Sequence, residues 1–265
     1  MQRTVTAHIE LSVTEPADLV FAVAVSAAYA PASEALSVSV DGAPVPVREL
    51  ADAHGGRLHR VHAPTGTLRL DYGATIDGTA APLTADETEL LVYGRPSRYA
   101  ESDALAPTAG AEFAGIDDPA ALLLAVSSWV GTELSYVSGS SLPTDGATRT
   151  LLARQGVCRD YSHLCVALLR ARGIPARLVA VYAPGLDPMD FHAVTEAWID
   201  GAWRIVDATT LAPRDTLVRI ATGRDAADTA FLNVLSGRAD LVDVRVTATA
   251  DVLPGDDLDR LVRLQ

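Results

Sequence analysis

Apolar and polar residues alternate along roughly the first 80 positions of the chain, which is the pattern of β-strands with one buried face. In residues 4–13, apolar side chains occupy every odd position, and residues 36–40 and 68–76 repeat the alternation. The pair Asp41-Gly42 follows the second of these runs and is typical of a two-residue hairpin turn. We therefore predict a small antiparallel β-sandwich domain over residues 1–88.

From residue 89 onward the pattern changes to mixed helices and strands. An apolar stretch after Asp118-Pro119 predicts one helix, and Thr144 can cap a second that runs through residues 151–155 to Gly156. A third is expected over residues 157–172, where Gly173 ends it. Three strand-like segments then follow, at residues 176–183, 192–199 and 202–209. We assign residues 89–265 to a second domain of the α+β class.

The composition is that of an ordinary globular protein, with 49% hydrophobic and 21% charged residues. A net charge of -13 repels the phosphates of nucleic acids and anionic membranes, so neither is an expected partner. The N-terminus lacks the features of a signal peptide, and the apolar run from Leu19 to Val25 is far shorter than the roughly 20 residues of a membrane helix. We therefore expect a cytoplasmic protein, and the sequence leaves the oligomeric state open.

Three histidines, His54, His59 and His62, occur close together in the first domain. A metal site there is conceivable, but neither a cysteine nor a helical histidine spacing supports it. We expect these side chains to occupy exposed strand positions.

The chain has two cysteines, Cys158 and Cys165, which share one predicted helix. At ~1.5 Å rise per residue their Cα atoms lie about 10 Å apart, too far for a disulfide. Cys158 falls in the first turn of the helix, where free backbone N–H groups favour a thiolate and can bind an oxyanion. Cys165 lies among leucines and is expected to be a core residue. The helix pattern alone does not separate a nucleophile at Cys158 from a buried free thiol.

The predicted hairpin downstream supplies the partners of such a nucleophile. Asp200-Gly201 is the preferred pair for a type I′ turn. With that turn, and provided that no bulge interrupts the register, His192 and Asp207 fall on one face, a diagonal step apart. Their Cβ atoms then lie within roughly 8 Å, so the side chains can form a hydrogen bond. An imidazole oriented by a carboxylate is the base that a thiol needs.

Other polar residues near these positions have competing interpretations. His163 is five residues from Cys158 on the helix, so it points elsewhere, toward a neighbouring helix or solvent. Glu196 shares the face of His192 and could be a further carboxylate behind it. Both Tyr136 and Ser140 are candidates for the side chain that donates a hydrogen bond to an oxyanion.

The segments GVCRDYSHLCVALLRARGIPARLV, FHAVTEAW, WRIVDAT and VRIATGRDAADTAF resemble the successive motifs of bacterial transglutaminase-like proteins, a family associated with cysteine protease activity. The resemblance covers about residues 93–247, and the β region before it is similar to the domain that commonly accompanies this core. It implies a papain-like α+β core with Cys158 as nucleophile, His192 as general base and then acid, and Asp207 as its orienting partner. Val194 departs from the pattern, since family members commonly have an aromatic residue there.

The implied chemistry is attack of the Cys158 thiolate on an amide carbonyl to give an acyl-thioester. Water would then complete a hydrolysis, and an amine would complete a transamidation. The resemblance favours hydrolysis of a peptide, protein or small amide, and no metal or organic cofactor is needed. Two other classes stay open: a catalytically silent binding or scaffold module, and an acyltransferase that uses a small-molecule thioester.

Overall fold

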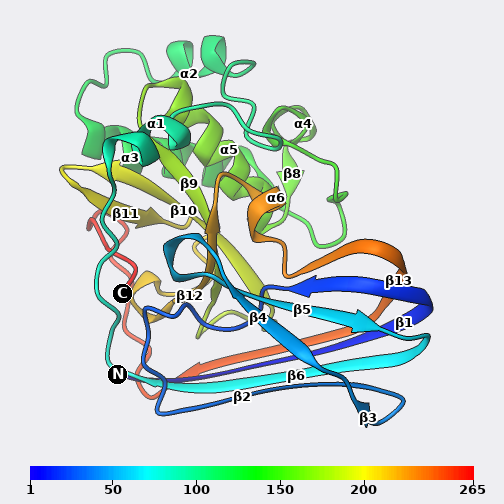
Figure 1. Cartoon of the computed structure of the whole chain (residues 1–265). Coiled ribbons are helices and arrows are strands. Elements are labelled where there is room, and N and C mark those ends of the chain that lie inside the picture. The colour runs from blue at the N-terminus through cyan, green and yellow to red at the C-terminus, as the bar shows by residue number, and fades with distance from the viewer.

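The computed structural model describes residues 1–265 and divides them between a sheet at one end and helices at the other (Figure 1). The N-terminal sheet contains β1 (Gln2–Phe21), β2 (Ser33–Val40), β3 (Ala43–Pro44), β4 (Val47–Ala51), β5 (Arg57–Ala63), β6 (Gly66–Asp77) and β13 (Leu232–Ala250). All of its pairs are antiparallel. A single-turn 3₁₀ helix, Ala53–Gly55, precedes β5.

The predicted alternation is confirmed, because the odd positions from Val5 to Val13 are at most 3% exposed. The expected sandwich takes the form of one curled sheet. β1 pairs with β6 along its first half and with β5 along its second, with Val13 opposite Gly66 and Ala17 opposite Ala63. Since β5 and β6 follow each other along the same edge of β1, the sheet bends there and encloses a single apolar core.

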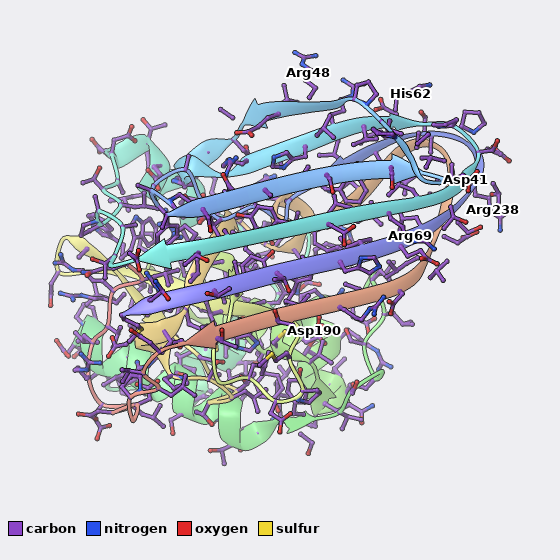
Figure 2. All side chains as sticks on the ribbon, turned by 90° about the horizontal axis from the view of Figure 1, so that it is seen from below. Asp41, Arg48, His62, Arg69, Asp190 and Arg238 are labelled. Carbon is purple, nitrogen blue, oxygen red and sulfur yellow. The ribbon has the colours of Figure 1, made fainter.

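The other edge of β1 is covered by β13, which returns from the far end of the chain. β13 pairs with β1 from Arg3 to Phe21, and the two strands lie side by side with β6 and β2 (Figure 2). We expected residues 232–250 to belong to the second domain, and the structure corrects this for β13. The open edge of β1 needs a partner for its backbone groups, and no local sequence pattern names a partner so distant in the chain. The boundary at residues 88 and 89 stays a prediction.

The second part of the chain has the predicted α+β arrangement. Its helices are α1 (Glu87–Tyr93), α2 (Ala106–Glu112), α3 (Pro119–Glu133), α4 (Ala147–Ala153), α5 (Cys158–Ala171) and α6 (Ala226–Thr229). Its strands are β7 (Ser135–Tyr136), β8 (Gln155–Gly156), β9 (Ala176–Tyr182), β10 (Phe191–Ile199), β11 (Ala202–Val206) and β12 (Val218–Gly223). A short 3₁₀ helix, Arg214–Thr216, precedes β12. The main sheet has the order β11-β10-β9-β12, and α5 packs on β10 and β9.

Hydrogen bonds join the two parts along the segment that follows β1. The Ala22 N–H donates to the Phe231 carbonyl (3.0 Å), and the Tyr182 hydroxyl donates to the Val23 carbonyl (2.7 Å). His54 contacts the Tyr93 hydroxyl of α1 at 2.7 Å. The N-terminal sheet is therefore fixed against the sheet that carries the candidate site. None of the helices has the length and apolar character to span a membrane.

Candidate active site

Cys158 is the first residue of α5, and the residues before it fix its position. The Asp160 carboxylate accepts a hydrogen bond from the Val157 N–H (2.9 Å) and so caps the helix. A Cβ atom at Gly156 would lie 2.6 Å from the Asp160 Cβ, so a larger residue does not fit there. The Cys158 thiol is free and half-buried, at the end of the helix where backbone N–H groups have no intrahelical partner.

His192 and Asp207 come together as the hairpin predicted. Asp200 and Gly201 have φ values of 50° and 71°, as a type I′ turn requires, and the pairing of β10 with β11 continues without a bulge. β11 ends at Val206, and Asp207 follows at once. The His192 Nε2 then lies 2.7 Å from the Asp207 Oδ2.

The second oxygen of this carboxylate has its own partners. The Asp207 Oδ1 accepts hydrogen bonds from the Thr209 backbone N–H (2.9 Å) and hydroxyl (2.7 Å). Sequence reasoning missed this function of Thr209. The signal was available, because an aspartate often hydrogen-bonds the backbone two residues on.

Burial and charge act against each other in this pair. Burial disfavours the charged imidazole, but the attraction and hydrogen bond of Asp207, together with the adjacent Cys158 thiol, raise the pKa of His192 well above its usual value. For Asp207, burial is likewise outweighed by His192 and Thr209, which lower the pKa of the carboxyl group. Both shifts favour the charged forms of the two groups. The buried His192 Nδ1 has no hydrogen-bond partner in the protein.

Two hydrogen bonds hold the helix of the thiol against the strand of the imidazole. The Ser162 hydroxyl of α5 donates to the Ala193 carbonyl (2.9 Å), and the Thr195 hydroxyl donates to the Ser162 carbonyl (3.2 Å). Cys158 and His192 both line a cavity of about 360 Å³. A larger cavity of about 550 Å³ lies on the Asp207 side and includes neither side chain. We assign the chemistry to the smaller cavity, because only that one contains the reactive atoms.

Of the two candidate oxyanion donors, the structure brings Tyr136 to the site. The parallel pairing of β7 with β8 places Tyr136 opposite Gly156, and its hydroxyl lies near the backbone amide of Cys158. Burial and the neighbouring thiol raise the pKa of Tyr136 to about 12, so the hydroxyl keeps its proton at neutral pH. The Ser140 hydroxyl instead donates to the Val137 carbonyl within its own loop (2.7 Å).

The residues expected to lie outside the site do so. Cys165 is 1% exposed, and burial raises the pKa of its thiol far above the usual value, so the prediction of a core residue is confirmed. His163 accepts a hydrogen bond from the Ala226 N–H of α6 (3.1 Å). Burial lowers the pKa of His163 to about 3, which keeps the ring neutral.

Glu196 is not behind His192 but forms part of a separate cluster. It accepts hydrogen bonds from Arg177 (2.8 Å) and from Arg219 (2.5 and 3.1 Å), and the Arg177 guanidinium lies 3.7 Å from the centre of the Trp203 ring. Burial opposes the charge of Glu196, but the two arginines lower its pKa to about 2. We call Arg177, Glu196 and Arg219 the arginine cluster.

The three histidines of the N-terminal sheet have separate surroundings. His54 contacts Tyr93, His59 is buried with its Nε2 3.4 Å from Glu49, and His62 is exposed. Exposed strand positions were therefore predicted correctly for His62 and wrongly for the other two, because the curled sheet and α1 cover them.

The chain is similar to known proteins in both sequence and structure. The family model of the transglutaminase-like superfamily matches residues 107–208, which include Cys158, His192 and Asp207. A crystal structure from Cytophaga hutchinsonii, described as a "putative cysteine protease", is 34% identical in sequence. The similarity covers 99% of this chain and 96% of that chain, with a TM-score of 0.89.

Similar mycobacterial sequences cover less of the chain. An uncharacterized protein of Mycobacterium leprae is 28% identical over 153 residues, which is 54% of this chain and 55% of that protein. An uncharacterized protein of Mycobacterium tuberculosis is 40% identical over 78 residues, 28% of this chain and 25% of that protein. The chain thus matches about half the length of the first and a quarter of the second.

Proposed function

The chain belongs to the bacterial transglutaminase-like family of thiol-dependent enzymes, and from this premise we propose that it cleaves peptide or amide bonds with Cys158, His192 and Asp207. The observation that carries the proposal is the buried His192, whose Nε2 is held by Asp207 and whose ring lines a cavity together with the Cys158 thiol. A thiol, an imidazole and an orienting carboxylate are the groups that this chemistry needs.

In the proposed reaction, the sulfur of Cys158 forms a bond to the carbonyl carbon of the substrate. The C–N bond then breaks, and His192 gives its proton to the departing nitrogen, which leaves an acyl-thioester. Water adds to the thioester while His192 accepts its proton, the C–S bond breaks, and the acid leaves. Asp207 keeps the imidazole oriented and stabilises its charge throughout.

We further propose that the backbone N–H of Cys158 and the Tyr136 hydroxyl bind the oxyanion of the tetrahedral intermediate. The protonated hydroxyl lies near this amide, which supports the assignment. Donors placed beside the position of developing charge typically contribute about 10²–10³ to the rate.

The test of the proposed function is cleavage of a defined peptide mixture, read by mass spectrometry of the products. We expect the wild-type protein and the Cys165→Ala variant to cleave the same bonds, and the Cys158→Ala variant to cleave none. Equal cleavage by the Cys158→Ala variant would refute the proposal.

The same assay separates hydrolysis from transamidation. The chain contains no lysine, so it offers no side-chain amine that could compete with an added primary amine. We propose hydrolysis as the main outcome, and expect acid products to exceed amine adducts when a biotin-labelled alkylamine is present. Amine adducts as the main product would instead assign a transamidase.

We place this activity in the cytoplasm, acting on a peptide, protein or small amide. The two free cysteines support this location, since thiols persist in a reducing compartment. Fractionation of cells that express the tagged protein would check it.

A further inference from the structure

The cavity beside the thiol is built from three separate parts of the fold. Its floor comes from the main sheet, through residues such as Ala180 of β9 and Ile220 of β12, and α6 forms a second wall with Ala226 and Ala227. A third wall comes from the junction with the N-terminal sheet, through Ala22, Phe231 and Asn233. At about 360 Å³ the cavity lies within the usual range of small-ligand sites, roughly 300–1,000 Å³.

Its lining is apolar and made of small side chains. Twelve of the seventeen lining residues are hydrophobic and six are alanine, which leaves room beside the stacked rings of Phe191 and Phe231, whose centres are 5.2 Å apart. The lining contains no acidic side chain. A cationic group entering the cavity would lose its hydration without gaining a carboxylate partner.

The lining contains one arginine, Arg159, and one nitrogen of its guanidinium, Nη2, is engaged within the protein. The Arg159 guanidinium donates to the Ser141 hydroxyl (2.5 Å) and the Leu142 carbonyl (2.6 Å), and lies 3.3 Å from the Asp160 carboxylate. With twelve hydrophobic residues and no carboxylate, the lining as a whole fits an aliphatic or aromatic group.

Buried polar residues hold the α6 wall in place before any ligand binds. The Asp225 carboxylate accepts from the backbone N–H groups of Tyr99 (2.8 Å) and Ala227 (2.9 Å), and His163 accepts from that of Ala226. The Tyr99 ring stacks on His163 with centres 5.3 Å apart. A wall fixed in this way is preformed, which lowers the cost of binding.

We propose that this cavity binds an apolar side chain on the acyl side of the scissile amide, so that the substrates are peptides or amides with aliphatic or aromatic acyl groups. The acyl group is the part that becomes bonded to Cys158, and the thiol faces this cavity, whereas Asp207 and Tyr136 line the more polar one. The N-terminal sheet, through the wall that includes Ala22 and Phe231, then takes part in substrate selection. This inference rests on the proposed function.

The test compares the labelling of Cys158 by chloromethyl ketones of N-acetyl-leucine, N-acetyl-phenylalanine, N-acetyl-aspartate and N-acetyl-lysine. Each second-order rate, read by mass spectrometry, is divided by the rate of the same reagent with free glutathione. We expect the leucyl and phenylalanyl reagents to exceed both charged reagents at least tenfold. Equal normalised rates, or a preference for a charged reagent, would overturn the inference.

Two variants locate the preference in the cavity. Ala230→Trp fills the space and should lower the rate of the leucyl reagent at least tenfold, whereas Ala111→Trp on the exposed end of α2 should leave it unchanged. Ala227→Glu, at an exposed position of the α6 wall, should raise the rate of the lysyl reagent and lower that of the leucyl reagent. Unchanged selectivity in both cavity variants would contradict the assignment.

Labelling by iodoacetamide, which has no side chain to select, keeps the two proposals distinguishable. Fast, His192-dependent labelling of Cys158 without side-chain preference would refute the apolar pocket and leave the proposed function standing. Slow labelling of Cys158 by every reagent, iodoacetamide included, would refute the proposed function and the inference with it.

Discussion

Strand β10 carries two buried ionic clusters only four residues apart, one around His192 and the other around Glu196. Both oxygens of Glu196 accept hydrogen bonds from buried arginines. The pair of His192 and Asp207 is equally buried, but its imidazole lies beside the Cys158 thiol, and both line one cavity. Burial and charge therefore do not mark a catalytic group by themselves. The thiol beside the imidazole distinguishes the two clusters.

The largest effect should come from removing the thiol beside His192. We expect Cys158→Ala to lower kcat/KM for amide cleavage by about 10⁴-fold or more, since triad members act as a unit. The melting temperature should stay close to that of the wild type, because the side chain is only half-buried. Cys165→Ala is the matched control on the same helix, and should keep the activity. Comparable losses of activity in Cys158→Ala and Cys165→Ala would contradict the assignment of Cys158 alone as the nucleophile.

Removing the negative charge of the arginine cluster should instead lower the stability of the fold. We expect Glu196→Gln to reduce the free energy of unfolding by about 3–5 kcal/mol, because two buried arginines lose their counter-charge. The measurement is urea unfolding, with kcat/KM of the folded protein determined in parallel. A stable variant that has lost its activity would show that Glu196 belongs to the catalytic machinery and break the comparison.

The two clusters should also determine how the free energy of unfolding changes with pH, one mainly at low pH (the acid limb) and the other at high pH (the alkaline limb). The pKa of Glu196 falls from 4.5 unfolded to about 2 folded, so its contribution of about 3 kcal/mol is present above pH 4.5 and lost as the pH falls toward 2. The pKa of His192 is raised, so its contribution is complete below pH 6.5 and lost as the pH rises through the folded value. Asp207, with a lowered pKa, adds to the acid limb.

Unfolding free energies measured from pH 2 to 10 check this division. Glu196→Gln should flatten most of the acid limb, and His192→Asn should flatten the alkaline limb. If the loss of unfolding free energy at low pH is unchanged in Glu196→Gln, other carboxylates cause it.

The smallest effect concerns the oxyanion. We expect Tyr136→Phe to lower kcat by about 10²-fold with little change in KM, since the hydroxyl would act on the intermediate and not on the bound substrate. Ser140→Ala, in the same loop, should leave both constants unchanged. The reverse ranking of the two variants would move the donor to Ser140.

The hairpin shows that part of the site could be predicted from residues that are close together in the sequence. The turn at Asp200-Gly201 fixes the register, and the register alone places His192 and Asp207 on one face. Gly156 and the helix after it similarly fix the position of Cys158. These elements could be predicted because each depends on residues at most 15 positions apart.

The remaining features depend on contacts between distant segments. The pairing of β13 with β1, the arginine cluster and the walls of the apolar cavity each join residues separated by tens to hundreds of positions. Periodicity shows that such a residue is buried but not what it is buried against. Glu196 illustrates this, since its face on β10 was predicted correctly and its partners, Arg177 and Arg219, were not.

The most direct test of the catalytic assignment is the rate of iodoacetamide labelling at Cys158 and Cys165 across pH, read separately by mass spectrometry in the wild type and in His192→Ala. We expect Cys158 to label at pH 6 at least a hundredfold faster than Cys165, and to lose that advantage without His192. Labelling of Cys158 no faster than Cys165, or indifferent to His192, would mean that the thiol and the imidazole do not act together, and would contradict the proposed function.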